Sequence, residues 1–336
     1  MSHEVNESQS SLRYGIIGTG AVGGLYGGML AKSGHDVHFL CRSDFDQVCS
    51  EGLRVDSIWG DFRLPGVQAY SRADQMPGCD VILVTTKSTS NPRLAELVRP
   101  LVTSSSVILN LQNGLNVEAD LLDSLPAERI LGGCCFLCCN KIAPAHVRHI
   151  DYGRIAFGLY RPASNEASIS AASIGKRAFA DMKESGIEVT WTDDLAATRW
   201  RKLMWNIPFN GLSVAIDAST DKIMQDVAAK RLAGEIIREV HAAAAYVGVA
   251  IDPQAIRQTM EHTETMVPYE SSMRLDYRFK RPLEIKAIFG NPMQAVADQM
   301  GLPLPEARSR TEWPLPRVAM LHDQLCYLDA SQRAAS

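Results

Sequence analysis

The sequence predicts an α/β protein in which a doubly wound, largely parallel sheet is followed by an all-α domain. The first observation is a glycine-rich turn that follows the apolar residues Ile16 and Ile17 and precedes a segment of helical composition. The second is a series of further short apolar segments in the first half of the chain. The third is the change after Asp194, where long helical stretches replace strand signals. We therefore place the two domains at residues 12–193 and 194–326.

The glycine-rich turn has the spacing G-x-G-x-x-G, with glycine at 18, 20 and 23. Gly18 permits a tight turn, Gly20 has no Cβ to keep a pyrophosphate away, and Gly23 lets the helix pack closely on the strand. The start of the helix offers free N–H groups to phosphates. In this strand–turn–helix context we favour a Rossmann-type dinucleotide site over a purely structural turn. Its predicted contacts are Gly18, Thr19, Gly20, Ala21, Val22 and Gly23.

The end of the second predicted strand, residues 34–40, indicates which dinucleotide binds. An acidic residue there is typical of NAD, whereas an arginine suits the 2′-phosphate of NADP. Arg42 follows this strand, so NADP(H) is the predicted cofactor. The alternative is that Arg42 is a solvated loop residue and that Asp44 or Asp46 binds the ribose.

Composition excludes several classes of protein. The chain has 336 residues, a formal net charge of -4, 46% hydrophobic and 21% charged residues, and no basic stripe that would favour nucleic acid. No apolar run is long enough to span a membrane. The polar segment Met1–Ser11 lacks the apolar core of a signal peptide, so we expect a loose leader and a cytoplasmic protein.

The cysteines Cys134, Cys135, Cys138 and Cys139 form the pattern C-C-x-x-C-C, which invites a metal or redox interpretation. A zinc site normally needs a second ligand pair at a suitable spacing, and none is evident downstream. The surrounding segment, residues 130–139, is apolar and strand-like. We therefore predict buried, reduced thiols and no metal site.

The remaining first half predicts a β-hairpin over residues 52–64 with a turn near Gly60, and then buried strands that place polar residues at one edge of the sheet. Lys87 follows the strand at 80–86, and Asn113 follows the strand at 106–111. In doubly wound sheets, ligands bind at the carboxyl edge. Further elements are expected as strands at 147–150 and 153–158 in an antiparallel extension, a helix at 167–185 and a strand at 187–191.

In the second half, the stretch from Trp200 to Asn210 places Lys202, Asn206 and Asn210 on one side of a helix. An ammonium group and two amides suit an oxyanion or carboxylate ligand. Pro208 should kink or end this helix. Taken by itself, the pattern also fits a polar stripe on a solvated helix.

Residues 13–310 resemble the ketopantoate reductase (2-dehydropantoate 2-reductase) family. The motifs are the glycine turn, Lys87, Gln112-Asn113-Gly114, the Lys202-x3-Asn206-x3-Asn210 pattern, and Ser271-Ser272-Met273 with Glu284 twelve residues after Ser272. Each is ordinary, but their joint order and spacing are specific.

The resemblance implies a Rossmann domain with a helical partner of the 6-phosphogluconate dehydrogenase C-terminal type, and NADPH-dependent reduction of 2-dehydropantoate to (R)-pantoate, a step of pantothenate and coenzyme A biosynthesis. It implies that Lys202 is the general acid, with Glu284 as its catalytic partner. We expect Glu284 to hold the ammonium in place. The implied substrate contacts are Asn113, Lys202, Asn206, Asn210 and Ser272. The implied cofactor contacts besides the glycine turn are Arg42 and Lys87 at the adenosine end, and Asn113 and Glu284 at the nicotinamide end.

Four positions depart from the family pattern: Ser90, Tyr269, Thr220 and Lys286. Because Tyr269 and Thr220 bear on the substrate pocket, a reductase of another branched or bulky 2-oxo acid is an alternative. A non-catalytic NADPH-sensing protein is a second alternative, although the intact Lys202 and Glu284 disfavour it. A 3-hydroxyacid or 6-phosphogluconate type dehydrogenase is a third, which the helix motif disfavours. The expected partner is a small 2-oxo acid, and a homodimer is the assembly that we consider, because helical domains of this kind often dimerise.

Overall fold

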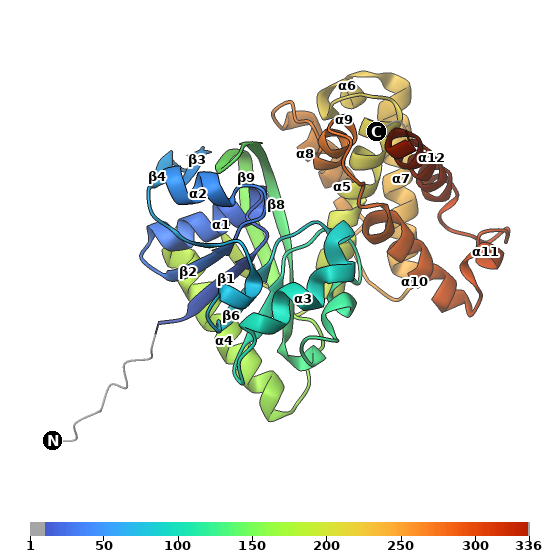
Figure 1. Ribbon diagram of the computed structural model, residues 1–336. Coiled ribbons are helices and arrows are strands. Elements are labelled where there is room, and N and C mark those ends of the chain that lie inside the picture. Colours follow the sequence, from blue (N-terminus) through green and yellow to red (C-terminus); the bar gives the residue numbers. More distant parts are fainter. Residues whose placement is uncertain (1–10, 335–336) are drawn as a thin grey trace.

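The computed structural model describes residues 11–334 and has two lobes (Figure 1). The sheet lobe comprises strands β1–β10 with helices α1–α4, and the helical lobe comprises α5–α12. The predicted leader lies outside the described residues, apart from Ser11. The last strand ends at Trp191 and the next helix begins at Leu195, on either side of the domain boundary that we propose. The proposed end at residue 326 falls inside α12.

All ten described strands belong to one sheet, in the order β4-β3-β9-β8-β7-β6-β1-β2-β5, with β10 beside β9. The strands are β1 (Arg13–Ile17), β2 (Asp36–Leu40), β3 (Leu53–Ser57), β4 (Phe62–Leu64), β5 (Gln68–Tyr70), β6 (Val81–Val84), β7 (Val107–Asn110), β8 (Ile130–Ala143), β9 (His146–Leu159) and β10 (Val189–Trp191). From β5 to β8 neighbouring strands are parallel. The predicted α/β class and the parallel centre of the sheet are confirmed.

The chain reverses its direction of travel across the sheet between β1 and β6. It first moves from β1 to β2 and β5, and then returns to β6, β7 and β8 on the other side of β1. The carboxyl ends of β1 and β6 are therefore the switch point at which ligands bind in open α/β sheets. The glycine turn follows β1 and Lys87 follows β6, so both lie at this point.

Strands in the parallel centre are buried on both faces, as such sheets require. In β6, Val81 and Leu83 belong to the core beneath α1 and α4, whereas Ile82 and Val84 belong to the core on the opposite face, beneath α3. The helices are α1 (Ala21–Lys32), α2 (Phe45–Glu51), α3 (Leu94–Val98) and α4 (Glu166–Glu184).

Three features of the sheet differ from the sequence predictions or go beyond them. The predicted hairpin is present as β3 and β4, but β3 pairs with β9 at the edge opposite β5. The two strands expected at 147–150 and 153–158 form one strand, β9, which is antiparallel to β8 and has a bulge at Gly153. The short strand β5 was not predicted. These features depend on pairing with distant segments, which local periodicity does not report.

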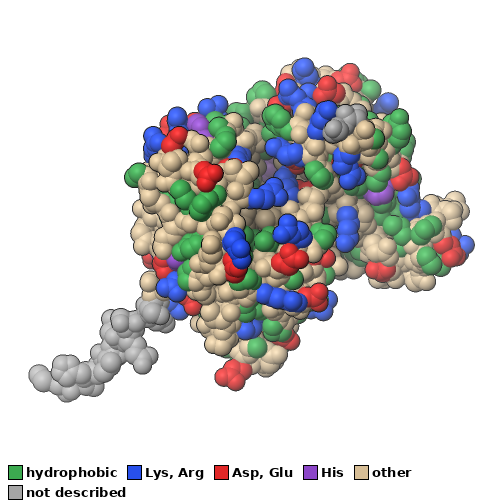
Figure 2. Space-filling view, in the orientation of Figure 1, with side chains coloured by type: hydrophobic (Ala, Val, Ile, Leu, Met, Phe, Trp, Pro, Cys, Tyr) green, Lys and Arg blue, Asp and Glu red, His purple; other side chains and the backbone are tan. Residues whose placement is uncertain are grey.

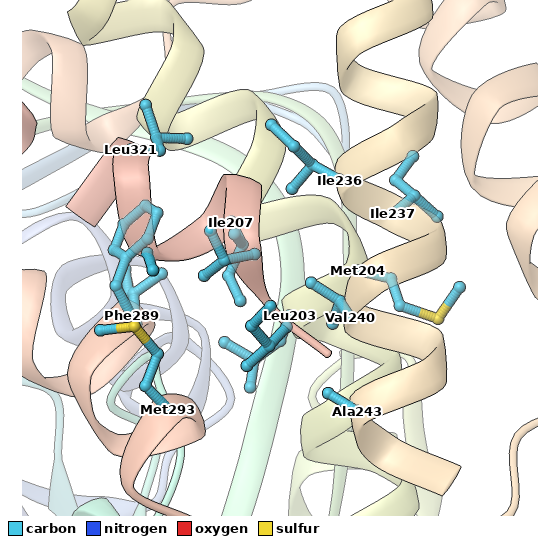
Figure 3. Close-up of a cluster of buried hydrophobic side chains, with 14 of the residues drawn as sticks. Leu203, Met204, Ile207, Ile236, Ile237, Val240, Ala243, Phe289, Met293 and Leu321 are labelled. Atoms are coloured by element: carbon cyan, nitrogen blue, oxygen red, sulfur yellow. The ribbon is translucent and has the colours of Figure 1, made fainter. Parts of the chain in front are cut away.

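The helical lobe is built around α5, which packs against α7, α9 and α12. Its helices are α5 (Leu195–Ala215), α6 (Thr220–Gln225), α7 (Val227–Tyr246), α8 (Gln254–Thr265), α9 (Ser272–Arg278), the π-helical turn Lys286–Gly290, α10 (Asn291–Met300), α11 (Leu304–Ala307) and α12 (Pro316–Ala334). Figure 3 shows Ile207 of α5 and Val240 of α7 among the buried side chains that join these helices.

We expected Pro208 to kink or end α5; the helix continues through Pro208, so it does not end there, and a kink at Pro208 stays a prediction. Pro208 and its neighbours Ile207 and Phe209 are buried. An interior proline costs a helix about 3 kcal/mol, and burial of the apolar face of a helix offsets such costs, because tertiary packing supplies most helical stability.

Candidate active site

A cavity of about 1690 Å³ lies between the two lobes, at the carboxyl edge of the parallel strands. Figure 2 shows Lys and Arg side chains gathered along the hollow between the lobes. The predicted residues that line the cavity are Gly18, Thr19, Gly20, Ala21, Val22, Arg42, Lys87, Asn113, Lys202, Asn206, Asn210, Ser272 and Glu284. Segments far apart in sequence thus meet at one site. Gly23 is the predicted residue that does not line it.

The glycine turn has the geometry that its spacing predicts. Gly18 has a φ of +103°, and a Cβ there would lie 2.8 Å from the backbone nitrogen of Thr86. A Cβ on Gly20 would meet nothing within 4 Å, so this position opens toward the cavity. Gly23 packs against Gly18 and Thr85, which explains its absence from the cavity wall. Among residues 11–334, no side chain caps the start of α1, so its first N–H groups remain available for an anion.

Just after β2, Arg42 and the two aspartates Asp44 and Asp46 have different surroundings. Asp44 is buried; its carboxylate pairs with Lys141 and accepts hydrogen bonds from the Ala145 N–H (2.9 Å) and the Ser43 hydroxyl (3.0 Å). Arg42 is exposed at the cavity and has no ion pair within residues 11–334. Asp46 lies on α2 and is not part of the cavity wall. Of the two interpretations, this geometry favours Arg42 as the group that faces the ribose.

Lys202 crosses from the helical lobe to the sheet lobe. Its ammonium donates to Asn113 Oδ1 (2.7 Å) and to the Cys135 carbonyl (2.5 Å), and it lies 5.8 Å from the centroid of the Phe136 ring. Burial lowers the pKa of Lys202, because both hydrogen-bond acceptors are neutral groups that do not replace the solvation of a charge. A lysine in this setting releases its proton more readily than one in water.

Asn206 and Asn210 follow Lys202 along α5 and are buried, with 4% and 2% of their surfaces exposed. The solvated-stripe alternative is therefore wrong. Asn206 Nδ2 and Asn210 Oδ1 have no hydrogen-bond partner among the described residues, and both residues line the cavity. Buried polar groups are normally satisfied, so the pair offers one donor and one acceptor to a ligand.

Ser272 also lines the cavity, at the start of α9. Its neighbour Ser271 has a structural role: the Ser271 hydroxyl accepts from the Arg274 N–H (3.1 Å) and bonds to the Ser213 hydroxyl (2.6 Å). The adjacent serines of the motif thus divide between capping a helix and facing the cavity.

Lys87 and Glu284 also bridge the lobes. The Lys87 ammonium lies 2.7 Å from Asp276 and 3.4 Å from Glu284, and Glu284 accepts from the Ser88 N–H (2.8 Å) and the Ser88 hydroxyl (2.9 Å). Burial by itself would lower the pKa of Lys87, but the two carboxylates together raise it. Glu284 therefore holds Lys87, whereas we expected it to hold Lys202. The adenosine-end role of Lys87 stays a prediction.

A buried ion pair that sequence reasoning missed supports the Asn113 loop. The side chains of Arg199 and Glu118 form an ion pair and are 3% and 2% exposed. Arg199 also donates to the carbonyls of Gln112 (2.7 Å), Gly114 (3.3 Å) and Asn110 (3.4 Å). It thereby fixes the loop that presents Asn113 to Lys202. No local pattern signals this pair, because its members are 81 residues apart.

The two substrate-pocket departures lie together. Tyr269 is 6% exposed and lines the cavity, whereas Thr220 is fully buried behind it and is not part of the wall. The Thr220 hydroxyl donates to the Tyr269 carbonyl (3.2 Å) and accepts from the Tyr269 N–H (3.3 Å). Only Tyr269 can touch a ligand directly. Of the other departures, Ser90 lines the cavity and Lys286 does not.

The four clustered cysteines are buried along β8, as predicted. Burial raises the pKa of the Cys135 and Cys138 thiols to about 12. Such thiols are poor nucleophiles at neutral pH. No cluster of three or more potential metal ligands occurs within residues 11–334. In the same part of the chain, no helix is long and apolar enough to cross a membrane.

The sequence of this chain matches a known protein family and a named relative. Residues 14–162 match the family model Ketopantoate reductase PanE/ApbA, and residues 194–310 match Ketopantoate reductase PanE/ApbA C terminal. A 2-dehydropantoate 2-reductase from Nostoc sp. is 41% identical over 321 residues, covering 96% of each chain.

Solved structures give the same result. The 2-dehydropantoate 2-reductase from Geobacter metallireducens superposes with a TM-score of 0.84 at 38% identity, over 94% of this chain and 100% of that one. A ternary structure of D-mandelate dehydrogenase with NADH and anilino(oxo)acetate has a TM-score of 0.82 at 19% identity, over 96% and 99% of the two chains, and shares the fold.

A glycine turn at the switch point of a parallel sheet, facing a helical lobe that supplies a lysine, defines an oxidoreductase with a nucleotide-binding fold. Within that class, the chain belongs to the ketopantoate reductase family.

Proposed function

We propose that this enzyme reduces 2-dehydropantoate to (R)-pantoate with NADPH, with Lys202 as the general acid. The observation that carries the proposal is the arrangement on α5: an ammonium whose pKa is lowered, followed on the same side of the helix by a buried unpaired amide donor and a buried unpaired amide acceptor. Together they match a 2-oxo acid that also carries a hydroxyl group.

The residues at the switch point fit a dinucleotide. The open position at Gly20 and the start of α1 suit a pyrophosphate. Arg42, which has no ion pair within the described part of the chain, suits a 2′-phosphate. Asn113 and Glu284 would line the nicotinamide end. When bound, NADPH supplies a hydride for the carbon of the keto group.

Lys202 completes the reduction. As the keto carbon accepts the hydride, negative charge develops on its oxygen, and the ammonium stabilises this charge and donates a proton to it. Asn113 and the Cys135 carbonyl orient the ammonium before reaction. The balance is one hydride to carbon and one proton to oxygen, which converts a ketone into a secondary alcohol.

The asparagines would select the substrate. Asn206 Nδ2 can donate to a carboxylate or keto oxygen, whereas Asn210 Oδ1 needs a donor, which the terminal hydroxyl of 2-dehydropantoate supplies. Ser272 adds a hydroxyl that can donate or accept. Tyr269 in the cavity wall supports a second candidate, the reduction of another branched or bulky 2-oxo acid. A role in pantothenate and coenzyme A biosynthesis, a cytoplasmic location and a homodimeric assembly remain predictions.

The test follows NADPH oxidation with 2-dehydropantoate and with an analogue that has a methyl group in place of the hydroxymethyl group. Leaving Asn210 unpaired should cost about 1–3 kcal/mol, or roughly 5- to 150-fold in kcat/KM. Equal kcat/KM for both compounds, or a preference for an aromatic 2-oxo acid, would favour the second candidate. No turnover of any 2-oxo acid, with NADPH bound, would indicate a nucleotide-sensing protein.

A further inference from the structure

Two arginines that line the cavity, Arg42 and Arg72, follow the neighbouring strands β2 and β5, just after each strand ends. Strands β2 and β5 are parallel, with Leu40 opposite Tyr70. The pairing continues beyond the strands, because the Cys41 N–H donates to the Tyr70 carbonyl at 2.8 Å. Arg42 and Arg72 each lie two residues past this last paired position, and both line the cavity. Since paired strands are about 4.8 Å apart, the two side chains start from adjoining positions.

We propose that Arg72 is a second ligand for a phosphate on the adenosine ribose, acting beside Arg42, and that Asp74 holds Arg72 in a competing ion pair. This inference rests on the proposed function and names the residues that would set its cofactor preference. A phosphate dianion has three terminal oxygens and can accept from two guanidinium groups at once. A ribose that carries only hydroxyl groups offers no such charge.

The Arg72–Asp74 pair has the properties of a releasable contact. Arg72 Nε donates to Asp74 Oδ1 at 2.9 Å, and its Nη2 donates to the second carboxylate oxygen. The two side chains are 68% and 54% exposed. Exposed ion pairs contribute little because water and salt screen them. A doubly charged ligand already held by Arg42 can therefore displace Asp74.

Asp44, which also lines the cavity near the end of β2, does not compete with a phosphate for an arginine. The buried Asp44 carboxylate is neutralised by Lys141 and by the Ala145 N–H. Asp74 is thus the carboxylate that competes for Arg72, and its removal should free Arg72. The proposal therefore predicts opposite effects: loss of Arg72 should weaken NADPH binding, and loss of the Asp74 charge should strengthen it.

The experiment measures dissociation constants of NADPH and NADH by the fluorescence of the bound nicotinamide, and of adenosine 2′-phosphate and adenosine 5′-phosphate by calorimetry. For Arg72→Ala, the Kd of NADPH and of adenosine 2′-phosphate should rise roughly tenfold, as for loss of one charge-assisted hydrogen bond. The Kd of NADH and of adenosine 5′-phosphate should change by less than about twofold. For Asp74→Asn, NADPH should bind more tightly and NADH should not.

The matched control is Arg257→Ala, which removes an exposed arginine paired with Glu261 on α8 outside this cavity. It should leave all four constants unchanged. Since Arg72 and Asp74 are exposed, thermal unfolding should show that both variants keep the fold.

Two results would overturn the role of Arg72 and leave the proposed function intact. One is wild-type affinity for NADPH in Arg72→Ala, and the other is an equal loss of affinity for NADPH and for NADH. An Asp74→Asn variant with unchanged NADPH affinity would remove the competing pair from the proposal. A wild-type enzyme that binds NADH as tightly as NADPH would instead contradict the NADPH dependence on which the inference rests.

Discussion

The buried pair between Arg199 and Glu118 gives a sharp test of how the active-site loop is held. We consider Arg199→Met, which keeps most of the side-chain volume but removes the charge and every donor. The variant leaves Glu118 as a buried carboxylate without its counter-ion, and it takes a donor from the carbonyls of Asn110, Gln112 and Gly114.

The expected loss follows from these contacts. Removing one partner of a buried ion pair costs about 3–5 kcal/mol, because the other charge stays buried and uncompensated. Each carbonyl that remains unsatisfied adds up to about 1–3 kcal/mol, although water entering the space would restore part of this. We therefore expect Arg199→Met to lower the free energy of unfolding by at least about 3 kcal/mol. Replacing Glu118 with Gln in the same chain should recover more than about 1 kcal/mol, since no uncompensated charge is left.

The assay is urea denaturation of the wild type and of the single and double variants, with the free energy extrapolated to water. The surface variant Arg257→Ala serves as the control, with an expected change within about 0.5 kcal/mol. A loss below about 1 kcal/mol for Arg199→Met would refute the reasoning, because it would mean that the pair is not effectively buried. A double variant as unstable as Arg199→Met would show that the carbonyl contacts, rather than the ion pair, dominate.

Other predictions concern catalysis and the substrate pocket. Lys202→Ala should lower kcat by at least about a hundredfold. The Kd of NADPH should change by less than roughly threefold, because Lys202 contacts the keto oxygen of the substrate in the proposed reaction. Comparable losses in kcat and in NADPH affinity would place Lys202 outside proton transfer. Since burial lowers the pKa of Lys202 from 10.5 and the protonated form is the acid, kcat for reduction should fall as pH rises through a value below 10.5, while kcat for alcohol oxidation should rise over the same range. A pH-independent kcat over that range would contradict this assignment. Thr220→Val should destabilise the protein by about 1–3 kcal/mol in urea denaturation, because it leaves the buried Tyr269 N–H without its acceptor, while the Tyr269 carbonyl keeps the Thr220 N–H. A neutral effect would show that the hydroxyl is replaceable. Tyr269→Ala should raise kcat/KM for bulkier 2-oxo acids relative to 2-dehydropantoate, and an unchanged ratio would show that this side chain does not limit the pocket.

Much of the geometry of the proposed cofactor site could be predicted from the sequence, because its determinants are local. The glycine spacing reports backbone conformation directly: Gly18 needs a positive φ, Gly20 needs open space, and Gly23 needs close packing. The positions of Lys87 and Asn113 follow from another local rule, since residues after parallel strands gather at one edge. The helical face of Lys202, Asn206 and Asn210 follows from the period of the α-helix.

What the sequence did not reveal concerns the partners of these groups. Lys202 was expected beside Glu284, yet its ammonium binds Asn113 and the Cys135 carbonyl, because the helical lobe meets β8 and the Asn113 loop at that point. Glu284 instead contacts Lys87 and Ser88. The angle and register between two lobes are set by many weak packing contacts, and no single segment encodes them.

The sequence by itself determined the α/β class of this protein, the geometry of the glycine turn and the face of α5 that carries Lys202, because each depends on backbone preferences within a few residues. The tertiary structure alone decided that α5 runs unbroken through Pro208, that the hairpin of β3 and β4 joins β9, and that Arg199 and Glu118 are buried together. These outcomes balance local costs against the burial of apolar and charged groups supplied by segments far away in the chain, and that balance exists only once the chain has folded.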